Sequence, residues 1–224
     1  GCTGSRFLNG TLDLHIELEE RLARFLNKEA CLTYSTGFQA NLGTIGTLAG
    51  REDTIYLDRK NHASIIDGAR MGYARVVKYR HNDLGQLRHI LEKNAGQPGM
   101  IITDGVFSME GDLADICGLA DLAEEFKVRL LVDDAHGVGA MGKTGKGTAE
   151  HLGCHERVDL MVGTFSKSFA CIGGFAAGPK GVISYLQHNA RTNIFSASLP
   201  PAAVATVLAA LDILEEQPEL IGKV

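Results

Sequence analysis

Short apolar runs alternate with longer amphipathic stretches along most of the chain. The runs are nearly all apolar, as in strands that are buried on both faces. They comprise residues 30–34, 54–57, 75–79, 100–103, 129–133, 159–163 and 174–178. Helical periodicity marks most of the segments between them, including residues 114–126, and also residues 201–216. This alternation predicts an α/β fold, a three-layer sandwich in which helices cover both faces of a mainly parallel sheet.

The stretch at residues 11–26 shows the helical pattern clearly. Its apolar residues recur at a spacing that places them on one helical face, and they are Leu14, Leu18, Leu22 and Phe25. On the other side, acidic residues precede arginines by four positions, in the pairs Glu17–Arg21 and Glu20–Arg24. Pairs at this spacing stabilise a helix surface. We therefore predict an amphipathic helix that carries two ion pairs on its polar side.

Composition narrows the class of protein. The chain has 224 residues, 45% of them hydrophobic, which suffices for one sizeable α/β domain or the larger part of a two-domain enzyme. Its formal net charge of −5, with no basic block, gives no electrostatic reason to expect a nucleic acid partner. No apolar run is long enough to span a membrane, and no secretion signal opens the chain. The scattered cysteines form no C-x-x-C pair and are Cys2, Cys31, Cys117, Cys154 and Cys171. We therefore expect a cytoplasmic enzyme with reduced cysteines and no metal centre.

One glycine-rich segment raises a nucleotide-binding alternative. Residues 137–144 match the pattern of Gly, four residues and Gly-Lys-Thr, in which backbone N–H groups surround phosphates. Such a loop begins directly where a strand ends, whereas residues 133–136 separate the apolar run from Gly137. Gly145 and Gly147 also disfavour the helix that should follow. We interpret the segment as a turn with two exposed lysines, and a P-loop nucleotide hydrolase is the disfavoured alternative.

Reactive side chains follow the predicted strands at their carboxyl ends, where parallel sheets bind ligands. Lys167 comes three residues after Thr164 and precedes a glycine-rich loop. A lysine that is desolvated among small residues can form a Schiff base with an aldehyde cofactor, and Thr164 can hydrogen-bond to a phosphate. Asp133, at the end of another apolar run, can keep a pyridinium nitrogen protonated. Together these residues indicate pyridoxal phosphate as the cofactor.

A series of motifs resembles the α-oxoamine synthases, which are pyridoxal-phosphate enzymes of fold type I. In chain order they are "GSRFLNGTLDLHIELEERLARFL", "YSTGFQANLG", "DRKNHASIIDGAR", "HNDL", "TDGVFSMEGDLADI", "LLVDDAHGVGAMGKTGKGT", "GTFSKSFACIGGF" and "NIFSASLPP". The resemblance implies that residues 1–224 are the cofactor-binding large domain. Both ends look cut, and we expect the family's N-terminal segment and C-terminal small domain to be missing. The glycine-rich turn is then the one that follows the family's Asp-x-x-His pair.

The resemblance also implies a role for each matching residue. Lys167 would bond covalently to the cofactor and later remove the substrate's α-proton. Asp133 would pair with the ring nitrogen, and His136 would hydrogen-bond to the phenolic oxygen. The other implied contacts are His62 on the ring face, Ser108 near the ring oxygen, and Gly37, Phe38, Thr164 and Ser166 around the phosphate. Ser196 would reach the phosphate of the other subunit, which implies a homodimer.

The reaction implied by the resemblance condenses a small amino acid with an acyl-CoA thioester, usually with loss of CO2. The motifs look most like those of bacterial serine palmitoyltransferases. Glycine C-acetyltransferase and 8-amino-7-oxononanoate synthase are close alternatives, whereas Phe7 stands where the aminolevulinate synthase branch carries a polar residue for succinyl-CoA. The family's arginine for the substrate carboxylate is absent from this chain. A catalytically silent subunit is therefore a further alternative, although the presence of Lys167 argues against it.

Overall fold

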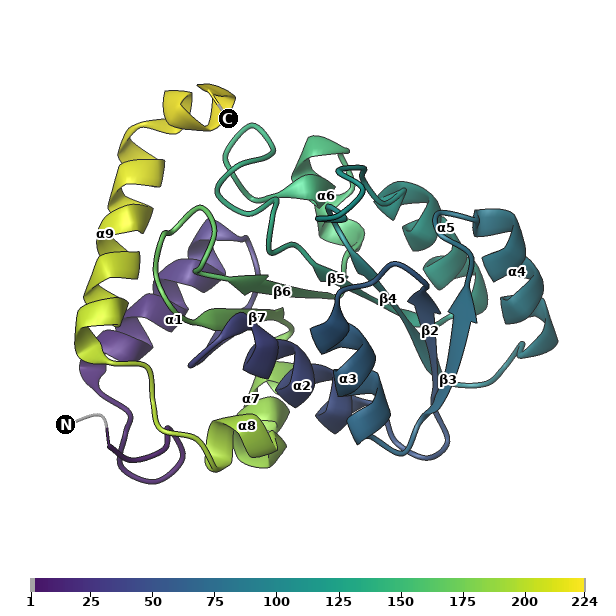
Figure 1. The fold of residues 1–224 in the computed structure, drawn as a ribbon, viewed down its shortest axis with the longest axis horizontal. Coiled ribbons are helices and arrows are strands. Elements are labelled where there is room, and N and C mark those ends of the chain that lie inside the picture. Colours follow the sequence, from purple (N-terminus) through teal and green to yellow (C-terminus); the bar gives the residue numbers. More distant parts are fainter. Residues whose placement is uncertain (1–2, 224) are drawn as a thin grey trace.

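A seven-stranded sheet forms the centre of the computed structural model, which describes residues 3–223 (Figure 1). The strand order is β1-β7-β6-β5-β4-β2-β3, and β7 is antiparallel to both of its neighbours while the other pairs are parallel. The strands are β1 (Ala30–Tyr34), β2 (Thr54–Asp58), β3 (Arg75–Tyr79), β4 (Gly99–Asp104), β5 (Arg129–Asp133), β6 (Leu160–Thr164) and β7 (Gly174–Gly178). Each matches an apolar run to within one residue at either end, so the predicted mainly parallel sheet is confirmed.

Helices on the two faces of the sheet enclose two separate apolar cores. One core lies beneath α1 (Asp13–Phe25), α4 (Leu84–Lys93), α5 (Ile116–Phe126) and α9 (Pro201–Glu216). The other lies beneath α2 (Gly37–Leu48), α3 (Ala63–Met71) and α7 (Lys180–Asn189). Short segments complete the chain, namely α6 (Thr148–His151), α8 (Arg191–Ile194) and the 3-10 helices η1 (His155–Arg157) and η2 (Pro218–Lys223). The predicted three-layer sandwich is confirmed.

The amphipathic helix near the start of the chain is α1, and its apolar face is buried as predicted. Leu18 and Leu22 have no exposed surface. The two ion pairs expected on its polar side are not formed. Instead, Arg21 binds Asp212 at 2.5 Å and Glu215 at 2.6 Å, both on α9, which packs along α1 (Figure 1). Arg21 therefore binds two carboxylates of a neighbouring helix instead of Glu17 on its own helix.

The cysteines differ from the expectation of a fully reduced set. Cys117 at the start of α5 and Cys154 after α6 form a disulfide, with their Cα atoms 5.7 Å apart. Cys31 and Cys171 are free thiols, and Cys2 lies outside the described residues. No local pattern indicates this pair, because 37 residues separate its members. Since disulfides are typical of oxidising compartments, this bond does not support the expected cytoplasmic location, which stays a prediction.

The topology brings the candidate functional side chains together at one edge of the sheet. Strands β4, β5 and β6 are parallel neighbours, so Asp104, Asp133 and Thr164 end them side by side. Loops and turns directly follow each of these strand ends before the next helix or strand begins, which leaves the side chains at this edge open to a ligand. Among residues 3–223, no helix is both long and apolar enough to cross a membrane.

Candidate active site

A cavity of about 380 Å³ opens at the carboxyl ends of β4, β5 and β6, between the first turns of α2 and α3. Eight of the residues predicted from the sequence line it together: Gly37, Phe38, His62, Ser108, Asp133, His136, Thr164 and Lys167. Ser166 lines it as well. Ser196 does not line the cavity. Its hydroxyl accepts a hydrogen bond from the side-chain amide of Gln39 at 3.1 Å. The structure thus brings all but one of the predicted side chains into one pocket.

The amino end of α2 forms one wall. Thr36 caps this helix, and its hydroxyl accepts the Gln39 N–H at 3.1 Å. The N–H groups that open a helix have no partners inside it, and the helix dipole favours an anion beside them. Gly37 lets the helix approach Thr164 closely, since a Cβ atom on Gly37 would lie 2.7 Å from the Cβ atom of Thr164. The wall is therefore a cradle of backbone N–H and hydroxyl groups.

The loop after β6 forms an adjacent wall and carries Lys167. Thr164 donates its hydroxyl to the Gly173 carbonyl at 3.0 Å and lies 2.9 Å from the Ser166 hydroxyl. Ala170 takes the left-handed conformation, with φ of 48°, as the loop turns back toward β7. The expected desolvation of Lys167 is wrong for this chain, because its side chain is exposed. Small neighbours leave too little side-chain volume to cover a long lysine.

Two buried carboxyl groups form the floor. Asp133 accepts hydrogen bonds from the Asn41 amide at 2.6 Å and the Ala135 N–H at 3.1 Å, while Asp104 accepts the His62 N–H at 2.8 Å. Burial raises the pKa of Asp133, against the effect of its hydrogen bonds. Burial and the charge of Asp133 raise the pKa of Asp104 to about 8. The floor thus holds two carboxyl groups whose ionised forms burial disfavours.

Two histidines stand above this floor. His62 caps α3, and its Nδ1 atom lies 2.7 Å from the Ser64 hydroxyl. His136 follows β5 by three residues and is half-buried. Burial, with the positive charges of Lys167 and His62, lowers the pKa of His136. His136 is therefore neutral at pH 7 and can donate or accept a single proton.

The sequence interpretation missed several lining residues, of which Asn41 and Asp104 contribute polar side chains to the floor. Asn41 lies one helical turn beyond Gly37, on the face that points to the end of β5. Asp104 ends the apolar run of β4, so its position at a strand end was the signal that could have revealed it. A helical Asn has no comparable signal, because polar residues inside helices are common on exposed faces.

The glycine-rich turn does not present its N–H groups to a ligand. Glu150 occupies it instead, accepting the Thr144 N–H at 3.1 Å, the Thr144 hydroxyl at 2.7 Å and the Lys146 N–H at 3.0 Å. A carboxylate of the protein thus fills the position that a bound phosphate would need. Of the two lysines expected to be exposed, Lys143 is exposed, whereas Lys146 is half-buried. This geometry argues against nucleotide binding at residues 137–144.

Comparison with known proteins decides the family. A model of the family described as aminotransferase class I and II matches residues 2–223. The chain belongs to this family. A serine palmitoyltransferase from Sphingobacterium spiritivorum is 53% identical over 98% of the chain and 55% of its own length. An 8-amino-7-oxononanoate synthase from Geotalea daltonii is 48% identical over 97% of the chain and 56% of its own length. The resemblance to α-oxoamine synthases is confirmed.

Solved structures agree with this assignment. A serine palmitoyltransferase from Sphingomonas wittichii superposes with a TM-score of 0.93 at 41% identity, over 96% of this chain and 54% of that one. A variant of the enzyme from S. paucimobilis, with a bound PLP–myriocin aldimine, gives a TM-score of 0.94 at 38% identity, over 98% and 55%. The fold-type I assignment is confirmed. The chain spans about half the length of the curated relatives it matches.

Proposed function

We propose that the chain is the cofactor-binding large domain of a pyridoxal-phosphate-dependent acyltransferase, which condenses a small amino acid with an acyl-CoA thioester. The observation that carries this proposal is the cavity, in which Lys167, the buried Asp133 and the α2 cradle line one space. The resemblance to serine palmitoyltransferases, several of them near 50% identity, favours that activity. An 8-amino-7-oxononanoate synthase activity is the alternative supported by relatives.

The residues fit pyridoxal phosphate in three respects. The α2 cradle, with Thr164 and Ser166, supplies donors for a phosphate, and a side chain on Gly37 would fill it. Burial raises the pKa values of Asp104 and Asp133, so the floor favours a cation such as a pyridinium nitrogen. Lys167 provides an amine at the rim. A cavity of about 380 Å³ falls within the usual range for small-molecule sites.

When bound, pyridoxal phosphate supplies an aldehyde that bonds to amines and a protonated ring that withdraws electrons from the bonded amine. Lys167 would hold the aldehyde and would accept the α-proton of the substrate at its Nζ atom. Asp133 would keep the ring nitrogen protonated, and Asn41 orients the Asp133 carboxylate through the 2.6 Å hydrogen bond. His62 would hold the ring, and His136 and Ser108 would bind its phenolic oxygen.

The proposed assembly is a homodimer in which Ser196 contacts the phosphate of the second subunit. Two observations support it. Ser196 lies outside the cavity of its own chain. Exposed apolar side chains flank it and the rim of the cavity: Phe195 is 76% exposed, Ile172 55% and Phe38 43%. Apolar side chains of this size are typical of protein interfaces.

Covalent labelling of the full-length protein tests the cofactor assignment. We expect borohydride reduction of the protein with pyridoxal phosphate to leave a pyridoxyl group on the peptide that contains Lys167, detected by mass spectrometry. Lys167→Ala should bind the cofactor but give no adduct. Lys143→Ala is the matched control and should be labelled at Lys167 like the parent. A label on Lys143 or Lys146 would contradict the assignment.

An assay of CoA release tests the substrates. Serine, alanine and glycine are each combined with palmitoyl-, pimeloyl- and acetyl-CoA. Release confined to serine with palmitoyl-CoA supports a serine palmitoyltransferase, and alanine with pimeloyl-CoA supports an 8-amino-7-oxononanoate synthase. A labelled Lys167 without release from any pair would favour the silent subunit.

A further inference from the structure

The segment His81–Leu84, between β3 and α4, contacts a loop of the cavity without lining the cavity itself. The loop comprises residues 105–114 and carries Ser108 on the cavity wall. Leu84 begins α4, and the Asp83 carboxylate caps that helix by accepting the Gln86 N–H at 2.8 Å. The two preceding residues, His81 and Asn82, contact the loop instead of helix α4. Their contacts define what the segment does.

His81 bridges two carboxylates. Its Nδ1 atom lies 3.0 Å from Asp58, which ends β2 and is 1% exposed, and its Nε2 atom lies 2.8 Å from Asp112 on the loop. The ring also meets Phe107 edge to face, with centroids 4.4 Å apart. A carboxylate only accepts hydrogen bonds, so both contacts are satisfied when both ring nitrogens carry protons. The geometry therefore selects the imidazolium form of His81.

Charges around the ring favour the same form. Burial by itself would lower the pKa of His81, but the hydrogen bonds and negative charges of Asp112 and Asp58 outweigh it and raise this pKa above the ordinary value. The other charged groups nearby are paired among themselves. Lys60 binds Glu110 of the loop, and Arg80 binds Asp83 at 2.7 Å. Neither pair places an uncompensated charge against the ring.

Asn82 adds a second tie to the loop. Its N–H donates to Asp58 at 2.9 Å, and its side-chain amide donates to the Leu113 carbonyl at 3.0 Å. This reach requires the left-handed conformation of Asn82, with φ of 51°, which Asn tolerates well. Asp58 therefore anchors both residues to the end of β2.

Hydrogen bonds join the two sides of the loop, so a contact that holds one side also restrains the tip. Val106 bridges Leu113, the Phe107 N–H donates to the Asp112 carbonyl at 3.0 Å, and the Gly111 N–H donates to the Phe107 carbonyl at 2.7 Å. The tip has little packing of its own, since Met109 is 90% exposed. Besides the buried Phe107 and the Lys60–Glu110 ion pair, the contacts at residues 112 and 113 therefore hold Ser108 in position.

We propose that His81 is a positioning residue, which as an imidazolium between Asp58 and Asp112 holds the 105–114 loop and Ser108 against the cavity. When His81 loses one proton, one ring nitrogen presents a lone pair to a carboxylate. That hydrogen bond is lost, and the loop is released. The folded state raises the pKa of His81. Both hydrogen bonds of the ring are therefore formed at low pH, and one is lost as pH rises through that pKa. The contact of Ser108 with cofactor rests on the proposed function, whereas the fixing of the loop does not.

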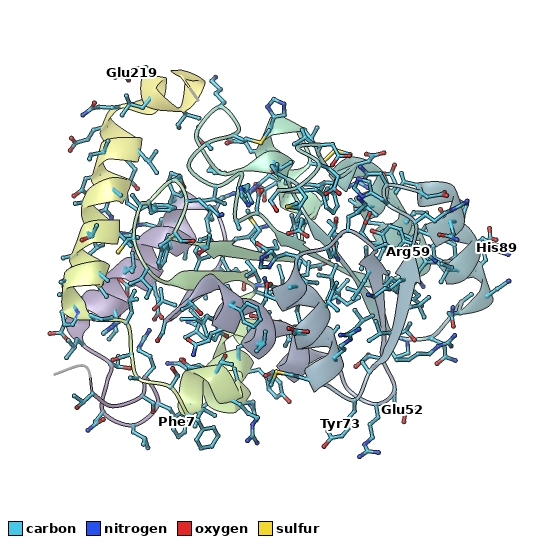
Figure 2. The ribbon with its side chains drawn as sticks, in the orientation of Figure 1. Phe7, Glu52, Arg59, Tyr73, His89 and Glu219 are labelled. Atoms are coloured by element: carbon cyan, nitrogen blue, oxygen red, sulfur yellow. A yellow bond between two sulfur atoms is a disulfide. The ribbon has the colours of Figure 1, made fainter. Side chains whose placement is uncertain are left out.

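Hydrogen–deuterium exchange of the cofactor-free, full-length protein tests the proposal. After correction for intrinsic exchange, peptides covering residues 105–113 should lose protection as pH rises from 6 to 9. His81→Gln should raise their exchange at pH 6 roughly tenfold, as for one charge-assisted hydrogen bond, and abolish the pH dependence. His89→Gln is the matched control, because His89 points away from the loop on the outer side of α4 (Figure 2). It should change neither result.

A second variant keeps the test decisive if His81→Gln does not fold. Asp112→Asn keeps an acceptor but removes one charge, so the loss of protection should shift to lower pH. Affinity for pyridoxal phosphate, measured by absorbance titration, should fall with the same pH profile. Protection of residues 105–113 that is the same at pH 6 and 9, and unaffected by Asp112→Asn, would overturn the proposal even if Lys167 labels as expected.

Discussion

At the scale of single residues, the two carboxyl groups of the cavity floor differ in how strongly their surroundings favour the ionised form. Asp104 and Asp133 are paired in register at the ends of β4 and β5, and both are buried. Asp133 receives hydrogen bonds from Asn41 and Ala135, which favour its ionised form. With its pKa near 8, Asp104 is mostly protonated at pH 7. The hydrogen bonds of Asp133 therefore favour a negative charge there over one at Asp104, although burial raises the pKa of both groups.

Replacing Asp104 with Asn should stabilise the cofactor-free protein at neutral pH. Folded Asp104 keeps its proton up to about pH 8, whereas the unfolded chain loses it near 3.8, so the stability from this group falls as pH rises across that window. Asn resembles the protonated carboxyl group and still accepts the His62 N–H. We expect denaturant unfolding from pH 5 to 8 to show a decline in the parent that exceeds the variant's by on the order of 3 kcal/mol.

The control for this experiment is Asp67→Asn, since Asp67 is exposed on α3 and does not line the cavity. It should leave the pH profile of the parent unchanged. An Asp104→Asn protein whose unfolding free energy declines with pH as steeply as the parent's would show that Asp104 does not carry the extra proton.

At the scale of elements, the cradle depends on how closely α2 approaches β6 and β7. A Cβ atom on Gly37 would lie 2.8 Å from the Thr164 hydroxyl, and one on Gly174 would lie 2.6 Å from the Cα atom of Gly37. Glycines at these two positions bring the amino end of the helix, with its free N–H groups, onto the strand ends. Helix propensity alone would favour alanine at Gly37. Close packing therefore outweighs propensity here.

Gly37→Ala should weaken binding of pyridoxal phosphate, because the added methyl group pushes α2 away from Thr164. We expect the dissociation constant from absorbance titration to rise about tenfold or more, as when one or two good hydrogen bonds are lost. Gly181→Ala in α7 is the matched control, since a Cβ atom there meets nothing within 4 Å. It should raise stability by about 0.5–1 kcal/mol without affecting affinity. Equal affinities for both variants would contradict the cradle.

At the scale of the whole molecule, the exposed apolar residues mark the proposed subunit contact. The segments around Phe7 and Phe195 lie side by side, because Ser5 bridges Ala197 and the Ser198 N–H donates to the Gly4 carbonyl at 3.0 Å. Leu8 is 77% exposed and Phe195 76%. Phe7 projects from the molecule in this region (Figure 2). Such residues gain most when a second subunit covers them.

Phe195→Asp should convert the proposed dimer of the full-length protein into a monomer. A charge buried against an apolar partner surface is costly, and we expect the dimer dissociation constant to rise at least about a hundredfold. Light scattering after size exclusion measures the mass directly. Tyr73→Asp is the matched control, because Tyr73 is 75% exposed but lies between α3 and β3 (Figure 2). A dimer that survives Phe195→Asp would place the contact elsewhere.

The sequence by itself determined the sheet, the buried face of α1 and the residue types at the strand ends. Each of these follows from local pattern: short apolar runs of about five residues between helical stretches are typical of buried strands, and parallel strands end at a common edge. Lys167, Asp133 and Thr164 were predictable for this reason. The cavity that joins them with His62 and His136 followed from the resemblance rather than from spacing.

Only the tertiary structure decided which side chains meet across long separations. Arg21 pairs with α9 instead of its own helix, Glu150 fills the glycine-rich turn, and Cys117 bonds to Cys154. Asn41 reaches Asp133 across 92 residues of sequence. No local pattern encodes such contacts, because their energies depend on distances that exist only after the sheet and its two helical layers have packed. Burial then sets the pKa values, since desolvation is a property of the folded environment and not of the residue.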